Sequence, residues 1–425
     1  MTDLEDRLSG VLSGAADRAP RVPDGLAATV KARHRRRRAR TAAVRAAAAV
    51  VVVAGGVGVA VDGLGASAQP SPAVDGTGQA PPPIEKVWPE AVRKIPAKLP
   101  DGRAYHPQLL LDDDTLLVMT GVSDGRRQFL WRYDLRTGRP TRVAEIPPTK
   151  GSAIFADGVA AGGGNIVWWA SYKEAGGPRV ARIWTVPAAG GSPRRVADVP
   201  LGNVMKQGHI NGLQVAGSDV VFAYEKGGVH RVPLSGGTPR PVKGAERHHV
   251  LEWPWVGAHH GKAIFRELLN VETGERRDAV VKADEEVRCG VERCAGVAVR
   301  NRIVKVERPR DPSGKEIRCG TKRCPDTVRS QTVVRRFVRD RDGSLERELP
   351  SGFQRGDDAG LERFFKVDRQ GSGLSLYDVD TGRSADLGIR PDAKGVMAIP
   401  DGGLDRLMTY PIKDRMYVVD LAAIE

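Results

Sequence analysis

The sequence lacks the short motifs by which many hydrolases and nucleotide-binding proteins are recognised. Its 425 residues contain no Gly-x-Ser-x-Gly elbow, no Walker phosphate loop and no His-Glu-x-x-His metal motif. The glycine-rich stretch GVAAGGGN, around Gly162, precedes a predicted strand, so we expect no phosphate loop there. We therefore assign no catalytic, cofactor-binding or metal-binding residue from sequence, although catalytic residues can also be assembled from distant parts of a chain.

The sequence also lacks a basic block outside its first 45 residues. Over the whole chain, 66 Lys and Arg exceed 52 Asp and Glu, for a formal net charge of +14. Met1–Arg45 holds eleven of the cations and five of the anions, a net +6, and includes the run RRRRAR. The remaining charge is spread thinly, so we expect a mildly basic surface and no nucleic-acid partner.

One charge-free apolar run follows these arginines. Ala46–Val61 alone would span about 24 Å as a helix, which is less than the hydrocarbon core of a bilayer. Starting the helix at residue 41, with Arg45 reaching the head groups, closes the gap. We therefore expect a transmembrane helix at 41–62, and the preceding arginines place the amino terminus in the cytoplasm.

Two other interpretations of the apolar run stay open. Ala66–Ala68, followed by Gln69, fits a small-x-small cleavage site, which would make the run a cleaved export signal. The 45 residues before the run are long for a signal, which favours an uncleaved anchor. A buried helix without a membrane role is the third interpretation. Both the anchor and the signal place everything after about residue 68 outside the cell.

Four regions are expected along the chain: a basic cytoplasmic tail (1–40), the membrane helix (41–62), a Pro/Gly/Ser-rich stalk (63–100) and a β-rich domain (101–425). The tail begins with a short amphipathic helix, which needs a partner or a membrane surface in order to fold. The residues of its apolar face are Leu4, Leu8, Val11 and Leu12.

A strand, turn and strand pattern recurs in the β-rich domain, as in WRYDLRTGRPTRV, WTVPAAGGSPRRV and SLYDVDTGRSADL. Each copy has a glycine in a tight turn, where a positive φ is needed. These glycines are Gly138, Gly191, Gly237, Gly274, Gly343 and Gly382. Their spacing is typical of four-stranded blades of about 40 to 50 residues, apart from a longer gap before Gly343 that contains an insertion.

The repeats predict an all-β fold, a β-propeller for which we expect seven blades, with six or eight as alternatives. The hairpins IWTVPAAGGSPRRV and WRYDLRTGRPTRV resemble TolB-type, WD40-like propeller repeats. The order of basic tail, Ala/Val segment, Pro-rich stalk and propeller is similar to that of single-pass envelope proteins of actinobacteria, some of them encoded beside extracytoplasmic-function sigma factors. This resemblance implies an extracellular propeller and assigns no catalytic residue.

The four cysteines form two similar pairs, Cys289 with Cys294 and Cys319 with Cys324. Four intervening residues suit a hairpin in which the two cysteines face each other within disulfide range. Because oxidation is expected outside the cell, we predict the local disulfides Cys289–Cys294 and Cys319–Cys324. A zinc site built from both pairs, free thiols and another connectivity are the alternatives.

The segment HHVLEWPWVGAHH holds half of the eight histidines and two of the seven tryptophans. It is a candidate ligand surface on one face of the propeller. Its residues are His248, His249, Trp253, Trp255, His259 and His260. The alternative is that they are ordinary strand and loop residues, with the tryptophans filling the space between blades.

This organisation favours a membrane-anchored binding or sensing module of the cell envelope. We expect no cofactor, and the expected partners are the membrane and an envelope protein, peptide or glycan. One alternative is a transmembrane regulator whose tail binds a cytoplasmic partner such as a sigma factor. No cysteine precedes Cys289, however, so the zinc site of zinc-binding anti-sigma factors is missing. The other alternative is an extracellular hydrolase or lyase.

Overall fold

The computed structural model describes residues 80–425, which belong to one compact unit, residues 70–425. The gaps within the described part are 122–126, 148–155, 174–176, 202–208, 306–317, 320–321, 324–327, 354–357, residue 361, 370–371, 393–395 and 403–405. The predicted tail face (Leu4, Leu8, Val11 and Leu12), the apolar segment 41–62 and the start of the stalk lie outside the described residues. Within the described part, no helix is long and apolar enough to cross a membrane.

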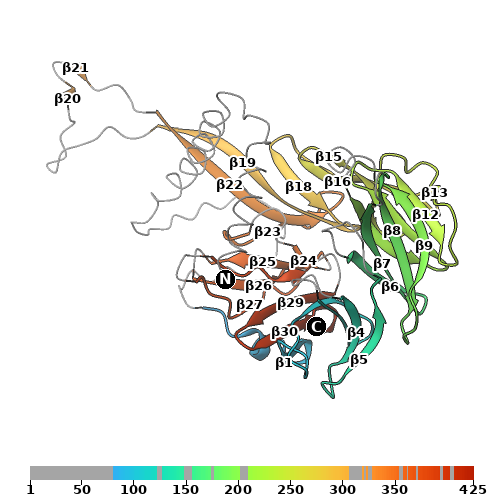
Figure 1. Cartoon of the computed structure of the whole chain (residues 1–425). Helices are drawn as coiled ribbons and strands as arrows, with labels where there is room; N and C mark the ends of the chain where they lie inside the picture. Colours follow the sequence, from blue (N-terminus) through green and yellow to red (C-terminus); the bar gives the residue numbers. More distant parts are fainter. Residues whose placement is uncertain are drawn as a thin grey trace, which may run out of the picture. The chain divides into compact units, whose positions relative to one another are not determined.

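The regular structure is almost entirely β-sheet, as the sequence predicts (Figure 1). The described helices are short: α3 (Ile84–Val87) and the 3-10 turns η1 (Pro89–Ala91) and η2 (Leu421–Ala423). Strands separated by one tight turn pair with each other, so each sheet is built mostly from neighbouring segments of the chain.

Four sheets consist of four antiparallel strands that are consecutive in sequence. The strands are β2 (Tyr105–Leu110), β3 (Thr115–Thr120), β4 (Phe129–Asp134) and β5 (Pro140–Glu145); β6 (Ala156–Gly162), β7 (Asn165–Lys173), β8 (Arg179–Pro187) and β9 (Arg194–Pro200); β10 (Ile210–Ala216), β11 (Asp219–Tyr224), β12 (Val229–Pro233) and β13 (Arg240–Pro241); and β24 (Asp358–Gly360), β25 (Phe364–Asp368), β26 (Leu374–Asp378) and β27 (Ser384–Asp386).

An eight-stranded sheet lies between β13 and β24 in the sequence. Its strands are β14 (His249–Glu252), β15 (Trp255–His260), β16 (Ala263–Asn270), β17 (Arg276–Asp278), β18 (Glu285–Cys289), β19 (Arg293–Lys305), β22 (Val328–Asp340) and β23 (Arg347–Glu348). Its two halves, β14 to β17 and β18 to β23, are each antiparallel and are joined by a short parallel pairing of β16 with β18. A separate two-stranded hairpin is formed by β20 (Arg318–Cys319) and β21 (Lys322–Arg323).

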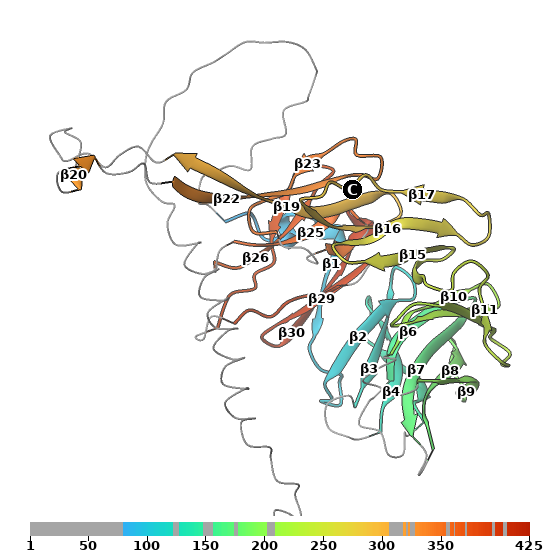
Figure 2. The same ribbon diagram turned by 90° about the horizontal axis from the view of Figure 1, so that it is seen from above.

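The last sheet is completed by the first strand. β28 (Asp401–Gly402), β29 (Leu407–Ile412) and β30 (Arg415–Asp420) are joined by β1 (Val92–Pro96), which pairs with β30 from Val92 opposite Val419 to Pro96 opposite Arg415. A strand from the start of the fold therefore closes the sheet at its end. Figures 1 and 2 show the sheets following one another in chain order, from β2–β5 to β28–β30.

The hydrophobic core lies between the sheets. Within the described residues, buried side chains form clusters between each pair of successive sheets or sheet halves; in one of them, Leu117 of β3 packs with Trp168 of β7. A further cluster joins the last sheet to the first, where Ile95 and Val418 pack with Leu116. Because every sheet is covered on both faces by its neighbours, the arrangement is a β-propeller.

The predicted turn glycines occupy the expected hairpins. Gly138, Gly274 and Gly382 have φ values of 70°, 78° and 71° in the turns that precede the last strand of a sheet or half-sheet. The insertion predicted before Gly343 lies between β19 and β22, which pair over thirteen residues, from Arg293 opposite Asp340 to Lys305 opposite Val328. Beyond the reach of β18 this pair runs on as a two-stranded ribbon (Figure 1).

β1 corrects the predicted boundary of the stalk. We expected residues 63–100 to be extended and unfolded, but Val92–Pro96 is a strand, and Ile84 and Trp88 are buried against the sheet β24–β27 and the last sheet. The high proline and alanine content of the region hid these few apolar residues. The partner strand is also more than 300 residues away in the sequence, so no local pattern marks the pairing.

The disulfide Cys289–Cys294 is present and links directly opposed residues of β18 and β19. It rules out the zinc site, because that site needed all four thiolates. Cys324 and the side chain of Cys319 lie outside the described part of the chain, so the second disulfide remains a prediction.

A buried ion pair stabilises the second half of the eight-stranded sheet. Arg339 donates to both carboxylate oxygens of Glu285, at 3.1 and 2.5 Å, and the exposed fractions of the two side chains are 1% and 0%. Arg335 and the main-chain N–H of Lys282 also donate to this carboxylate, at 3.1 and 2.8 Å. Burial opposes the ionisation of Glu285, but the donors outweigh it and lower its pKa.

We expect Arg339→Met to lower the free energy of unfolding by about 3–5 kcal/mol near neutral pH, because it leaves a buried carboxylate without its main partner. Urea unfolding measures this change. Arg415→Met is the control: its ion pair with Asp414 is exposed, and the expected loss is below about 1 kcal/mol.

The pKa of Glu285 is lower in the folded state than in the unfolded state. The ionised carboxylate therefore contributes its full stabilisation of the fold above the unfolded pKa, and this stabilisation is lost as the pH falls through the folded pKa. The difference in free energy of unfolding between the wild type and Arg339→Met should therefore become smaller in acid. Equal losses of unfolding free energy in Arg339→Met and Arg415→Met would contradict a stabilising role for the buried pair of Arg339 and Glu285.

Candidate functional site

The first strand of most sheets is bent by a β-bulge. The pairing register shifts where β2, β6, β10, β14 and β24 meet their next strands. A bulge increases the local twist and redirects side chains. In β10, Gly212 takes a φ of +62°, and a Cβ there would lie 2.9 Å from the carbonyl oxygen of Val250. Only glycine fits this close approach of β10 to β14.

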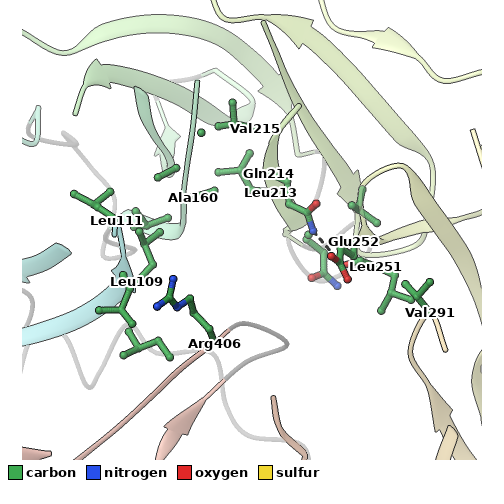
Figure 3. A pocket seen from close by; sticks show the side chains of 18 of the residues that line it. Leu109, Leu111, Ala160, Leu213, Gln214, Val215, Leu251, Glu252, Val291 and Arg406 are labelled. Carbon is green, nitrogen blue, oxygen red and sulfur yellow. Dashed lines mark hydrogen bonds between the residues drawn. The ribbon is translucent and has the colours of Figure 1, made fainter. Parts of the chain in front are cut away.

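Four of these bent strands, β2, β6, β10 and β14, line a cavity of about 1550 Å³. Figure 3 shows its wall, to which Leu109 contributes from β2, Ala160 from β6, Leu213 from β10 and Leu251 from β14. Arg406, which precedes β29, reaches it from the last sheet. Nearly every sheet therefore supplies part of one wall, which combines aliphatic and charged side chains.

Gln214 links two of the lining strands (Figure 3). Its Nε2 donates to the carbonyl of Leu251 at 3.1 Å, and its Oε1 accepts from the main-chain N–H of Trp253 at 2.9 Å. Both hydrogen-bonding ends of this amide are thus used between β10 and β14. Gln214 therefore holds β10 and β14 together in the wall.

Three arginines of the cavity wall are bound by the protein's own carboxylates. Arg406 pairs with Asp420 and, at 2.7 Å, with Asp113. Arg293 lies 2.7 Å from Asp380. Arg363 donates to both carboxylate oxygens of Asp378, at 2.8 and 2.7 Å. These pairs fix the side chains and leave little net charge on this part of the wall.

The turn closed by the disulfide binds a carboxylate from the next sheet. Glu362 accepts hydrogen bonds from the main-chain N–H groups of Val291, Glu292 (3.0 Å) and Arg293 (2.6 Å). Glu362 itself has a φ of +51°. Three convergent N–H donors form a cradle for an anion, which Glu362 fills from within the chain. This contact joins the turn between β18 and β19 to the turn between β24 and β25 of the next sheet.

A pair of stacked imidazoles forms another part of the wall. The rings of His249 in β14 and His259 in β15 are 3.8 Å apart between centroids and 6° from parallel. His249 is 5% exposed, and its Nδ1 has no hydrogen-bond partner among the described residues. On its other side, His259 meets the edge of Phe265 at 4.7 Å.

Phe265 is held in a strained backbone conformation. Its φ is +58°, where a residue with a bulky side chain is uncommon. The buried guanidinium of Arg341 donates to the carbonyls of Phe265 (3.2 Å), Arg266 (2.5 Å) and Gly290 (2.7 Å). Arg341 therefore stabilises the bend in β16 that presents Phe265 to His259.

Both imidazoles are neutral near physiological pH. Burial, followed by the charge of His248, lowers the pKa of His249. Burial of the ring against its neighbours lowers the pKa of His259 to about 4, and repulsion from His249, when that ring is protonated in acid, and from Arg288 adds to this. Each ring therefore offers one N–H donor and one acceptor nitrogen.

Arg288 differs from the other arginines of the wall. It lies in β18, next to Cys289, and lines the same cavity as the histidine pair. Within the described part of the chain its side chain makes no hydrogen bond or ion pair, and its buried Nε has no partner. Arg132, which also lines the cavity and has no carboxylate partner in that part, donates to the carbonyl of Ala188 at 3.5 Å. Arg288 lies opposite Ile264 of β16, and Ile264 lies opposite His259 of β15, so the unpaired guanidinium belongs to the same part of the wall as the two imidazoles.

The structure separates the six predicted surface residues. His249 and His259 line the cavity, as described above, whereas His248 precedes β14 and the side chain of His260 lies outside the described residues. Trp253 donates from its indole to Glu272 at 2.9 Å, and Trp255 is buried between the two halves of the eight-stranded sheet. Both tryptophans pack between sheets, as the alternative interpretation held.

Sequence reasoning missed Arg288, Phe265 and the cavity itself. One local signal was present: DGVAAGGG and NGLQVAGS share a glycine at the second position, and these are the bulge glycines Gly158 and Gly212. No sequence pattern identifies Arg288, because only the folded structure shows that its side chain has no partner among the described residues. Within the described part, no three His, Cys, Asp or Glu side chains are grouped to hold a metal ion.

Comparison with protein-family models found no match, and comparison with curated proteins found none either. Solved structures do match. The β-propeller domain of the Trilobed protease from Pyrococcus furiosus is 10% identical, with a TM-score of 0.37 over 74% of this chain and 92% of that one. YCF48 bound to D1 peptide is 10% identical, with a TM-score of 0.43 over 80% and 97%.

An oligogalacturonate lyase in complex with manganese also matches, at 14% identity and a TM-score of 0.30 over 76% of this chain and 78% of that one. The protease domain and YCF48 are β-propeller proteins. At such identities and TM-scores, they say nothing about the activity of this chain.

We expect the pKa of His259 to be about 4 and to rise in Arg288→Gln, because that substitution removes a nearby positive charge. NMR titration of the histidine ring signals, assigned with His259→Gln, measures both values. A pKa near the ordinary value of 6.5 in the wild type, or no rise in the variant, would show that His259 does not face Arg288.

Proposed function

We propose that the protein is a binding module of the cell envelope and that its binding surface is the cavity at the centre of the propeller. The observation that carries this proposal is the composition of the wall, which most sheets share. Its volume of about 1550 Å³ exceeds the roughly 300–1000 Å³ of a typical small-molecule pocket. A segment of a peptide or a glycan is an occupant of suitable size.

The chemistry of the wall supports binding over covalent catalysis. The described residues that line the cavity include no serine or cysteine, and the hydroxyl of Thr115, which also lines it, has no general base within hydrogen-bond reach among them. Their aliphatic side chains offer contact area, and most of their charges are already compensated within the protein. Such a wall is suited to holding a ligand by shape and by a few uncompensated polar groups.

The location is part of the same proposal. We keep the segment 41–62 as an uncleaved membrane helix with a cytoplasmic amino terminus and an extracellular propeller. The disulfide Cys289–Cys294 supports an oxidising compartment. An amino terminus at Gln69 in the mature protein would replace the anchor with a cleaved signal. We also propose seven blades, counting each half of the eight-stranded sheet as one.

Arrays of peptides and glycans, probed with the detergent-solubilised full chain, test the proposal. Ala160→Arg places a long cation in the cavity and should weaken binding of any selected ligand by about tenfold or more. Ile399→Arg is the matched control, because Ile399 is 73% exposed and does not line the cavity. Ligands that bind Ala160→Arg as tightly as the wild type would place recognition elsewhere.

A further inference from the structure

We infer that Arg288, together with His249 and His259, forms a carboxylate-binding subsite in the wall of the cavity. This inference deepens the proposed function by naming a chemical group that the ligand carries. It rests on the positions of these side chains in the cavity wall and on the hydrogen-bond partners that they lack.

The first observation is the unpaired guanidinium. Of the other arginines that line the cavity, Arg293, Arg363 and Arg406 each have a carboxylate partner within the protein. Arg132 donates to the carbonyl of Ala188. The side chain of Arg288 has neither kind of partner among the described residues, although its Nε is buried. A buried polar group without a partner is costly, so an anionic ligand would stabilise Arg288 as the internal carboxylates stabilise its neighbours.

The second observation is independent of the first. His249 is almost fully buried, yet its Nδ1 lacks a partner among the described residues, and the stacked ring of His259 lies beside it. A neutral imidazole can donate one hydrogen bond, and an ionised carboxylate only accepts. A carboxylate therefore satisfies both Arg288 and a histidine N–H at once.

The charges of the wall favour a carboxylate over other ligands. A metal cation would meet the positive charge of Arg288, and the histidine pair has no third ligand grouped with it in the described part. A phosphate dianion would meet one compensating cation at this subsite, in a wall that also holds the carboxylate of Glu252. A single negative charge matches the one guanidinium beside the histidine pair, since Arg132, the other cation of the described wall without a carboxylate partner, lies in β4 of another sheet.

The strained residue next to the pair fits the same role. Phe265 keeps its positive φ because Arg341 binds its carbonyl, and its ring fixes the orientation of His259. Backbone strain of this kind is concentrated at binding sites and costs on the order of 1–3 kcal/mol. The result is a preorganised surface with an apolar ring beside the polar groups.

Acetate is the minimal probe, with acetamide as its neutral counterpart and inorganic phosphate as the competing anion. Ring signals of His249 and His259 in the full chain, assigned with His249→Gln and His259→Gln, report binding. We expect saturable shifts with acetate, and weak or no shifts with acetamide or phosphate. Arg288→Gln should weaken acetate binding by about tenfold or more, and Arg288→Lys should retain part of it.

Arg415→Gln is the matched control and should bind acetate as the wild type does, because Arg415 is exposed and lies outside the cavity. Thermal unfolding of each variant confirms that it is folded. Equal acetate binding by wild type and Arg288→Gln, or equal shifts with acetamide, would overturn the inference.

The two proposals can fail separately. Ligands that Ala160→Arg loses and Arg288→Gln retains would leave the cavity as the binding site and refute the carboxylate subsite. The opposite result is that acetate binding depends on Arg288 while the array ligands bind Ala160→Arg as tightly as the wild type. It would support the subsite and refute the wider cavity as the recognition surface.

Discussion

The pairing of β1 with β30 is the constraint on which the rest of the fold depends. Successive sheets bury their faces against each other, and the last cluster of buried side chains can form only if the last sheet meets the first. Ile95 of β1 packs in that cluster with Leu116 and Val418. Because no sheet buries both faces alone, one short strand closes the ring and gives every sheet two neighbours.

Closure also creates the cavity. The bulged first strands point their side chains toward a space that exists only while the sheets stay in a ring. Most charges in its wall are neutralised by partners from neighbouring strands or sheets, as with Arg293 and Asp380. The side chain of Arg288 and the Nδ1 of His249 have no hydrogen-bond partner among the described residues, and this contrast is the basis of the proposed carboxylate subsite.

The sequence predicts what is local. Turn glycines such as Gly138 and the opposed pair Cys289 and Cys294 were predictable, because a tight turn and a short hairpin depend on a few adjacent residues. β1 was missed because its partner is distant in the sequence. In the candidate surface, His249 and His259 reach the cavity and the two tryptophans do not, since burial between sheets depends on tertiary packing that no local pattern contains.

Hydrogen–deuterium exchange of Ile95→Asp, compared with Arg93→Asp on the same strand, tests ring closure most directly. Ile95 is buried and Arg93 is exposed. If closure makes the ring cooperative, Ile95→Asp should lower amide protection in every sheet, including β14–β17, which is distant from β1 in the ring. Loss of protection confined to β28–β30 and β2–β5, or equal effects of both substitutions, would contradict a fold that depends on closure.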